Sequence, residues 1–136
     1  MKVWIRAENG QKPIQIDDLL TIRETGIRYG VPWQLILALA YHESGMNPLA
    51  TNTNPATPST PETTDYGMLQ INSHYHPTLN MSLWWHAWYN TAFACDLLLR
   101  EFYKHQDWHT AAWMWSARDL AWATYQYWLN LEACDE

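Results

Sequence analysis

Residues 37–50, LALAYHESGMNPLA, place one glutamate at the end of an otherwise apolar helix. The helix is predicted to end at Gly45, because glycine is the residue most often found just past a helix end. At about 100° per residue, Leu39 and Ala40 lie on the same face as Glu43, and that face should be buried. The sequence therefore predicts a carboxyl group on the wrong side of the helix for an ordinary surface charge.

Burial of this kind changes what a carboxyl group can do. Desolvation disfavours the anion, and the negative end of the helix dipole at Ser44 and Gly45 repels it, so both effects should raise the pKa of Glu43. A carboxylic acid that stays neutral can donate a proton, as cleavage of a glycosidic bond requires. An isolated glutamate more often caps a helix, pairs with an arginine or turns to solvent. The residues around Glu43 in the sequence are therefore needed to distinguish these roles.

Length and charge restrict the class of protein. The 136 residues fit one domain, 1–136, in which 1–16 is predicted as a peripheral N-terminal segment. The net charge is −6 and the eight lysines and arginines are scattered, which argues against a nucleic-acid-binding surface. We expect neither a signal peptide nor a membrane span in this chain, because no apolar run is long enough.

Helix signals recur along most of the chain. After the helix that carries Glu43, residues 51–65 are rich in Thr, Pro and Asn and are predicted as an exposed loop or a small irregular β lobe. No long strand is predicted. The fold class is therefore mainly α with one loop-rich insertion. Asp17, Ser82, Asp107 and Asp119 are predicted to begin helices, and the expected helices are 18–30, 32–44, 83–105, 108–117 and 120–133.

Two motifs resemble a known family. Residues 28–48, RYGVPWQLILALAYHESGMNP, and residues 65–75, DYGMLQINSHY, are similar to the lysozyme superfamily, in particular to single-domain soluble lytic transglycosylases and in part to c-type lysozymes. The resemblance implies a mainly α, lysozyme-like fold. It also implies an enzyme that cuts the β-1,4 bond between N-acetylmuramic acid and N-acetylglucosamine in peptidoglycan. By resemblance Glu43 is the catalytic acid, Gln70 and Asn72 line the floor of the glycan cleft, and Ser44 belongs to the substrate site, which it helps to hold together.

The chain departs from the transglycosylase pattern near its C-terminal end. The family carries Ala-Tyr-Asn-Ala-Gly after the long helix, whereas residues 113–117 read Trp-Met-Trp-Ser-Ala, so the tyrosine that would contact the acid is missing. Asp65 stands where c-type lysozymes have a second catalytic carboxylate, with a turn residue as the alternative. Trp113 matches a tryptophan that packs on the acid in those lysozymes, with a core role as the alternative. Tyr75 stands where they stack sugars, with a solvated turn as the alternative.

The sequence leaves two mechanisms open. In the transglycosylase route, implied by the family, Glu43 protonates the bond and then deprotonates the C6 hydroxyl of the sugar, which gives a 1,6-anhydro product. In a retaining hydrolase, Asp65 would lie ~5–5.5 Å from the acid and would attack or stabilise the anomeric carbon. An alternative of another class is a non-catalytic glycan-binding or assembly module, although an idle carboxyl on an apolar face costs desolvation free energy.

The remaining polar residues predict no cofactor and no metal site. His105 and His109 would share a helix face only if the helix ran through Asp107, and no third ligand is evident. Cys95 and Cys134 permit one disulfide but do not require it. The expected partner is the peptidoglycan glycan strand. Because the acidic chain gains no attraction to anionic walls, we expect local delivery to the cell wall or periplasm by a phage lysis system, a virion or an envelope machine.

Overall fold

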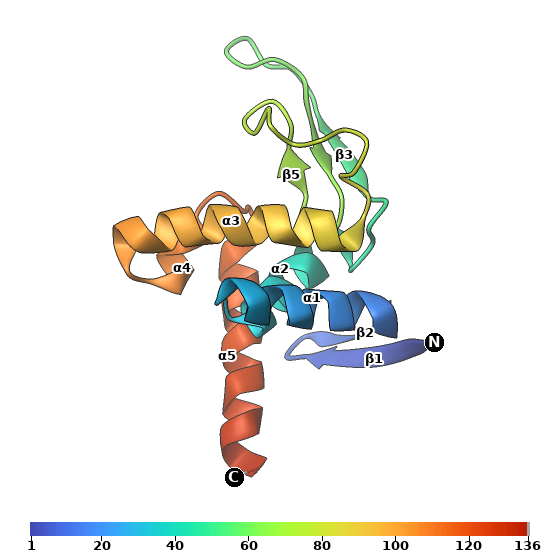
Figure 1. Cartoon of the computed structure of the whole chain (residues 1–136), viewed down its shortest axis with the longest axis vertical. Coiled ribbons are helices and arrows are strands. Elements are labelled where there is room, and N and C mark those ends of the chain that lie inside the picture. The colour runs from blue at the N-terminus through green and yellow to red at the C-terminus, as the bar shows by residue number, and fades with distance from the viewer. Residues whose placement is uncertain (136) are drawn as a thin grey trace.

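The structure is a computed structural model that describes residues 1–135, with side chains described as far as Glu132. A small β lobe stands on one side of a helical body (Figure 1). Among the described residues, no helix combines the length and the apolar character needed to cross a membrane. The elements of residues 1–135 are, in order, β1 (Lys2–Ala7), β2 (Gly10–Gln15), α1 (Ile16–Tyr29), α2 (Trp33–Ser44), β3 (Thr51–Asn54), β4 (Thr63–Tyr66), β5 (Ile71–Asn72), α3 (Ala87–His105), α4 (Trp108–Ala111) and α5 (Arg118–Asp135).

Helix α2 lies at the centre of the helical body. Its residues from Leu35 to Tyr41 are all buried, and it packs against α1, α3 and α5. A helix that is apolar on every side belongs in a core. Pro32 occupies the N-cap and Gly45 the C-cap, where the Gly45 N–H donates to the Tyr41 carbonyl over 3.1 Å. The predicted limits of this helix are confirmed, and Glu43 lies in its last turn.

The Thr- and Pro-rich segment forms the small β lobe. Its three strands pair antiparallel in the order β3-β4-β5, with Asn52 opposite Asp65 and Asp65 opposite Asn72. This register places polar residues of three adjacent strands in one row across the sheet. The lobe stands beside the N-terminal half of α3 (Figure 1), so one edge of the helical body faces a polar sheet.

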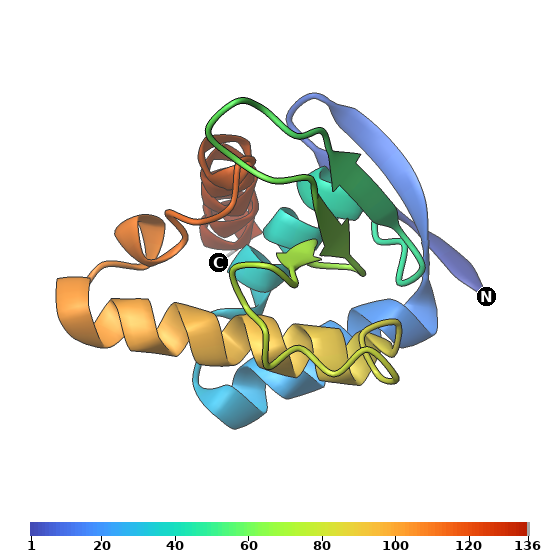
Figure 2. The same cartoon turned by 90° about the horizontal axis from the view of Figure 1, so that it is seen from above.

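Residues 1–16, predicted as a peripheral N-terminal segment, contain two strands of six residues each, although no long strand was predicted. They form an antiparallel hairpin, β1–β2, and Ile14 belongs to the main hydrophobic core while Ala7 is also buried. The hairpin curves along the edge of the molecule and reaches α5 (Figure 2). There the Trp128 indole N–H donates to the Arg6 carbonyl over 2.6 Å. The N-terminal residues are therefore an integrated part of the fold.

The long helix begins later than predicted. The sequence predicts a cap at Ser82, whereas α3 begins at Ala87 after a series of turns. The Trp84 carbonyl accepts a hydrogen bond from Asn90 Nδ2 over 3.0 Å and not from the backbone N–H four residues on. The buried Asn90 side chain thus satisfies a carbonyl that a longer helix would have used.

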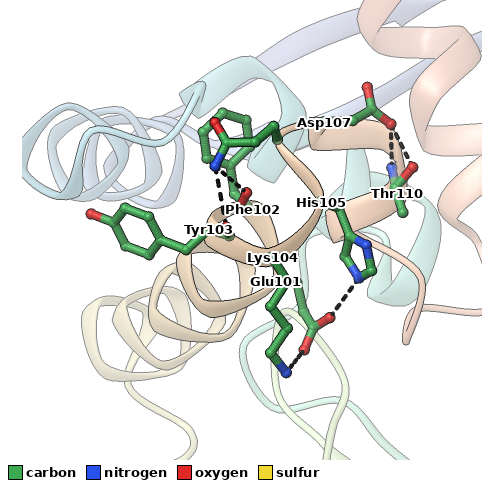
Figure 3. Close-up of polar contacts among 8 residues, drawn as sticks. Glu101, Phe102, Tyr103, Lys104, His105, Asp107 and Thr110 are labelled. Carbon is green, nitrogen blue, oxygen red and sulfur yellow. Dashed lines mark hydrogen bonds and ion pairs between the residues drawn. The ribbon is translucent and has the colours of Figure 1, made fainter.

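The helix predicted over 108–117 is shorter in the structure and ends at Ala111. Its predicted cap is confirmed, because Asp107 Oδ2 accepts a hydrogen bond from the Thr110 N–H over 2.9 Å (Figure 3). Further on, the Ala117 N–H donates to a side chain of α2 and not to a carbonyl of its own segment. The chain between α4 and α5 therefore leaves the helical path and turns towards α2.

Two residue pairs were singled out in the sequence. The two histidines of the first pair do not share a helix, and the second pair includes a cysteine whose side chain lies outside the described residues. Helix α3 ends at His105, and Gln106 follows at φ 57°, so His105 and His109 lie on separate helices. Cys95 is buried in the core, and burial raises the pKa of its thiol to about 12. The side chain of Cys134 lies outside the described residues, and so does any pairing with it.

Candidate active site

A cleft of about 610 Å³ opens between the β lobe and the helical body. Its walls come from the end of α2, from the β lobe with the turn after β5, and from the segment between α4 and α5. Among the described residues, its lining does not include Ser44. The other residues predicted for the site meet there: Glu43, Asp65, Gln70, Asn72, Tyr75 and Trp113.

Glu43 presents its carboxyl group to the cleft from the last turn of α2. Its Oε1 accepts a hydrogen bond from the Ala117 N–H over 3.1 Å. Burial is the largest influence on this group and raises its pKa. The bond from Ala117 lowers the pKa, the nearby charge of Asp65 raises it, and a bond with the Ser116 side chain lowers it, with a net rise. Glu43 therefore keeps its proton to a higher pH than an exposed glutamate does.

Asp65 lies in the same cleft and comes from β4. Its Oδ1 accepts a hydrogen bond from Asn72 Nδ2 over 2.9 Å, and its Oδ2 accepts one from Asn54 Nδ2 over 3.1 Å. Neutral amides on the two neighbouring strands thus fix the position of this carboxyl group. The cleft holds two carboxyl groups from different lobes, one buried at a helix end and one held by a sheet.

Gln70 lines the cleft, and the polar atoms of its side chain form hydrogen bonds within the protein. It is buried, with a φ of 52°. Its Nε2 donates to the carbonyls of Gly67 (2.8 Å) and Ala50 (3.2 Å), and its Oε1 accepts from Asn52 Nδ2 over 2.6 Å. These three bonds hold a side chain whose backbone sits in a region that costs a non-glycine residue about 1–2 kcal/mol. Gln70 therefore acts on the cleft through the shape of the loop.

Ser44 joins the two lobes behind the cleft. Its hydroxyl lies 2.7 Å from the Met68 carbonyl and 3.2 Å from the Ala40 carbonyl, and donates to them. It also accepts from the Asn47 N–H over 3.2 Å. One hydroxyl thus fastens the end of α2 to the loop that precedes β5, a position consistent with holding the site together.

Asn72 connects the acidic and aromatic residues of the β lobe. Its Nδ2 donates to Asp65, while its Oδ1 accepts from the backbone N–H groups of His74 (3.0 Å) and Tyr75 (3.3 Å). The same side chain thus orients the second carboxylate and the turn that carries Tyr75. Tyr75 is 62% exposed and lines the cleft, so a ligand in the cleft can reach it.

Trp113 belongs to the wall that faces the β lobe. It is 55% exposed and lines the cleft, so the alternative of a core role is wrong for this residue. Trp115 takes the core position, since it is buried and its Nε1–H donates to the Leu69 carbonyl over 2.7 Å. One tryptophan of this segment thus anchors it, and the other offers its surface to the cleft.

Glu101 of α3 lies near the exposed Trp113. The nearby Trp113 side chain is the largest influence on the pKa of Glu101 and lowers it. Glu101 also lies 3.2 Å from Lys104 Nζ and 3.3 Å from His105 Nε2 (Figure 3).

One known protein family matches more than half of this chain. The family model described as Transglycosylase SLT domain matches residues 21–113, which is more than half of the chain. The chain belongs to this family. This transglycosylase SLT domain is therefore a peptidoglycan glycosidase of the lytic transglycosylase type, and the predicted membership and mainly α, lysozyme-like fold are confirmed. Comparisons with curated proteins and with solved structures gave no significant match.

Sequence reasoning missed three groups at the site of the SLT domain. Ser116 and the Ala117 N–H, which bond to Glu43, lie where the family carries the end of its Ala-Tyr-Asn-Ala-Gly motif. That alignment was a usable signal for both. Asn54, which bonds to Asp65, lies in a Thr- and Pro-rich stretch, and only the register of the β lobe brings it to the cleft. No local sequence pattern distinguishes it from its neighbours.

Proposed function

We propose that this enzyme cleaves the β-1,4 bond between N-acetylmuramic acid and N-acetylglucosamine as a lytic transglycosylase, with Glu43 as the acid and then the base. The observation that carries the proposal is the placement of Glu43. Its carboxyl group lines the cleft, is partly buried, and has a raised pKa. These properties suit an acid that must hold a proton until a leaving group takes it.

In the first step, the Glu43 carboxylic acid gives its proton to the glycosidic oxygen as the bond to the anomeric carbon breaks. The sugar acquires oxocarbenium character, and the carboxylate of Asp65 on the other lobe can stabilise that charge. In the second step, the C6 hydroxyl of the same sugar attacks the anomeric carbon and passes its proton to Glu43. No water is consumed, so the 1,6-anhydro product is one water lighter than a hydrolysis product.

The Ala117 N–H has a role in this cycle that follows from its position. It donates to Glu43 Oε1, which leaves the other carboxyl oxygen to carry the proton. When Glu43 has given up the proton, the same N–H stabilises the carboxylate until the C6 hydroxyl restores it. The backbone donor thus makes both charge states of the acid accessible in one turnover.

Hydrolysis is the second candidate function, and one observation favours it. Asp65 lines the same cleft as Glu43, close enough for its charge to raise the pKa of the acid. A retaining hydrolase needs a second carboxylate beside the acid, whereas the transglycosylase route can proceed without it. The two functions share their first step and differ in what attacks the anomeric carbon.

The products distinguish these candidates directly. Purified peptidoglycan is digested with the enzyme, and the released muropeptides are measured by mass spectrometry. Anhydromuramic ends support the transglycosylase, and reducing ends support the hydrolase. Absence of any released fragment from a folded, peptidoglycan-binding protein would contradict both proposed functions.

Substitution of Asp65 by Asn should separate a supporting carboxylate from an essential one. For a transglycosylase, we expect the rate to fall by less than roughly 10-fold, because the acid that breaks the bond stays in place. Since the Asp65 charge raises the pKa of Glu43, its removal should also move the loss of activity at high pH towards lower pH. Rates of muropeptide release from pH 4 to 9 measure both effects.

The matched control for this experiment is Asp17→Asn, which removes an exposed carboxylate in the first turn of α1. It changes the net charge equally but lies outside the cleft lining, and it should leave both rate and pH profile unchanged. A much larger loss for Asp65→Asn, of about 10²-fold or more, would identify Asp65 as an essential group and favour the hydrolase.

A further inference from the structure

The hairpin β1–β2 is linked to the two residues that immediately precede Glu43, directly to Tyr41 and through α5 to His42. Glu8 follows β1 and Lys12 lies on β2. Lys12 Nζ donates to the Tyr41 carbonyl over 3.2 Å and lies 4.3 Å from the centre of the Tyr41 ring. Glu8 reaches His42 through a residue of α5. The hairpin therefore engages α2 in its last turn, next to the acid.

Thr124 of α5 is the centre of this contact. It is fully buried, and its hydroxyl oxygen lies 2.7 Å from His42 Nε2. The same hydroxyl donates to the Glu8 carboxylate, with 3.0 Å to Oε1 and 2.9 Å to Oε2. Three elements that are distant in sequence thus meet at one hydroxyl group. We call the chain Glu8–Thr124–His42 the clasp.

The hydrogen bonds of the clasp fix the protonation of the histidine. A threonine hydroxyl has one proton, and here it points to Glu8, so the oxygen can only accept from His42. His42 must then carry its proton on Nε2, the nitrogen that faces Thr124. Burial lowers the pKa of His42, the charge of Glu8 raises it, and the charge of Lys12 lowers it, with a net fall. Burial and Lys12 thus favour the neutral imidazole, and the clasp holds it in one orientation.

The end of α2 is a place where such support matters. The helix ends at Gly45 in the left-handed conformation, and the last turn of a helix frays easily. Helix α5 already holds this turn at the acid itself, because Ala117 just before it donates to Glu43. Two turns further on, Thr124 holds the preceding residue. The family match covers residues 21–113 and includes neither the hairpin nor Thr124.

We propose that the hairpin is a positioning element for the catalytic acid: through the clasp and the Lys12 contact, it keeps the last turn of α2 in the geometry that presents Glu43 to the cleft. This inference rests on the proposed role of Glu43. Within the described part of the chain, the cleft lining includes none of Thr124, Glu8 and His42, so they act only through the position of the acid. A displacement of the acid by a fraction of its hydrogen-bond length is enough to slow proton transfer strongly.

The decisive variant is Thr124→Val, which keeps the shape of the side chain and removes the hydroxyl. We expect kcat for muropeptide release to fall by roughly 10-fold or more while KM stays within about twofold, because the cleft is intact and the acid is misplaced. Thr124→Ser restores the hydroxyl and should recover at least about half of kcat. If Thr124→Val does not fold, Glu8→Ala at an exposed position breaks the same clasp and should give the same selective loss.

A matched control separates positioning from stability. Trp128 lies one turn after Thr124 on α5 and fastens the same hairpin through the Arg6 carbonyl. Trp128→Phe keeps an aromatic ring, though a smaller one, and removes that bond, so it should lower the melting temperature and leave kcat within about twofold. The proposal is overturned if the folded clasp variant keeps kcat within about twofold, or if Trp128→Phe at equal destabilisation loses as much.

Two further measurements test the clasp and the proposed function separately. Nitrogen NMR of the wild-type imidazole should show His42 protonated on Nε2, and a predominantly Nδ1-protonated ring would contradict the clasp. Glu43→Gln reports on the underlying function. If Glu43→Gln keeps activity, the proposed function is wrong whatever the clasp does, and if it is inactive while Thr124→Val is fully active, only the positioning proposal is wrong.

Discussion

Glu43→Gln is expected to lower the rate of muropeptide release by roughly 10²–10⁴-fold, the usual contribution of a general acid and base. Glutamine has the same shape and can still accept the hydrogen bond from the Ala117 N–H. It cannot give a proton to the glycosidic oxygen or take one from the C6 hydroxyl. Binding to intact peptidoglycan should therefore persist while cleavage is lost. Sedimentation with purified sacculi and mass spectrometry of the supernatant measure the two properties in one sample.

The same substitution should stabilise the fold in a pH-dependent way. Burial raises the pKa of Glu43 in the folded protein, so the folded state binds the proton more tightly than the unfolded state. The stability that this proton confers is complete below the unfolded pKa and is lost as pH rises through the folded pKa. Above the folded pKa, wild type carries a desolvated carboxylate that Glu43→Gln lacks. The melting temperature of the variant should therefore exceed that of wild type increasingly as pH rises.

A suitable control is Glu24→Gln, which alters an exposed glutamate of α1. It should change neither cleavage nor the pH dependence of melting. Retention of more than about a tenth of wild-type activity by Glu43→Gln would remove the acid from the mechanism. A melting difference that does not change with pH would show that the carboxyl group titrates as it does in the unfolded chain.

The limits of α2 could be predicted from the sequence, but the burial of this helix differs in part from the expectation. Proline and glycine mark its two ends, and these are local signals that tertiary structure rarely overrides. The expected buried face, however, extends around the helix, since Leu35 to Tyr41 are all buried. Glu43 reaches the cleft because it lies in the last turn, where the helix leaves the core, rather than because of its face alone.

The N-terminal hairpin carried a signal that the prediction did not use. Val3, Ile5 and Ala7 alternate with polar or exposed residues, and Asn9-Gly10 is a strong two-strand turn signal. Pro13 is compatible with this hairpin, because both strands of a two-stranded sheet are edges and tolerate a missing donor. The hairpin was thus predictable, although its contact with the end of α2 was not.

Contacts that depend on three-dimensional arrangement lay beyond the sequence. The start of α3 depends on the Asn90 amide, which bonds to the Trp84 and Tyr66 carbonyls and accepts from the Leu69 N–H. A propensity argument cannot foresee that one side chain will satisfy a loop 20 residues away. Apart from Glu43 and Trp113, the cleft residues were accessible only through the motif at 65–75, because their spacing is a property of the family and not of any helix or strand period.

Gly67→Ala is expected to destabilise the fold by about 2–5 kcal/mol, the largest stability loss among the changes considered. Gly67 has a φ of 80°, where an L side chain costs about 1–2 kcal/mol. An added Cβ would also lie 2.8 Å from Asn90 Cγ and 2.9 Å from the Trp84 carbonyl oxygen, with Asn90 Nδ2 closer still. Asn90 is 1% exposed and bonded on every side, so it cannot move aside. Denaturation with urea measures the loss.

Gly30→Ala is the matched control, because Gly30 has a similar φ of 73° and no atom lies within 4 Å of the added Cβ. It should lose only the conformational part, about 1–2 kcal/mol. Equal losses in the two variants would mean that the Asn90 contact has no cost and that the loop is softer than its bonds indicate.

The Gly67 substitution also matters for catalysis, since the Gly67 carbonyl accepts from Gln70 on the cleft floor and Asp65 lies two residues earlier. A strained Gly67→Ala protein that remains folded should therefore lose activity as well, whereas Gly30→Ala, at the far end of α1, should not.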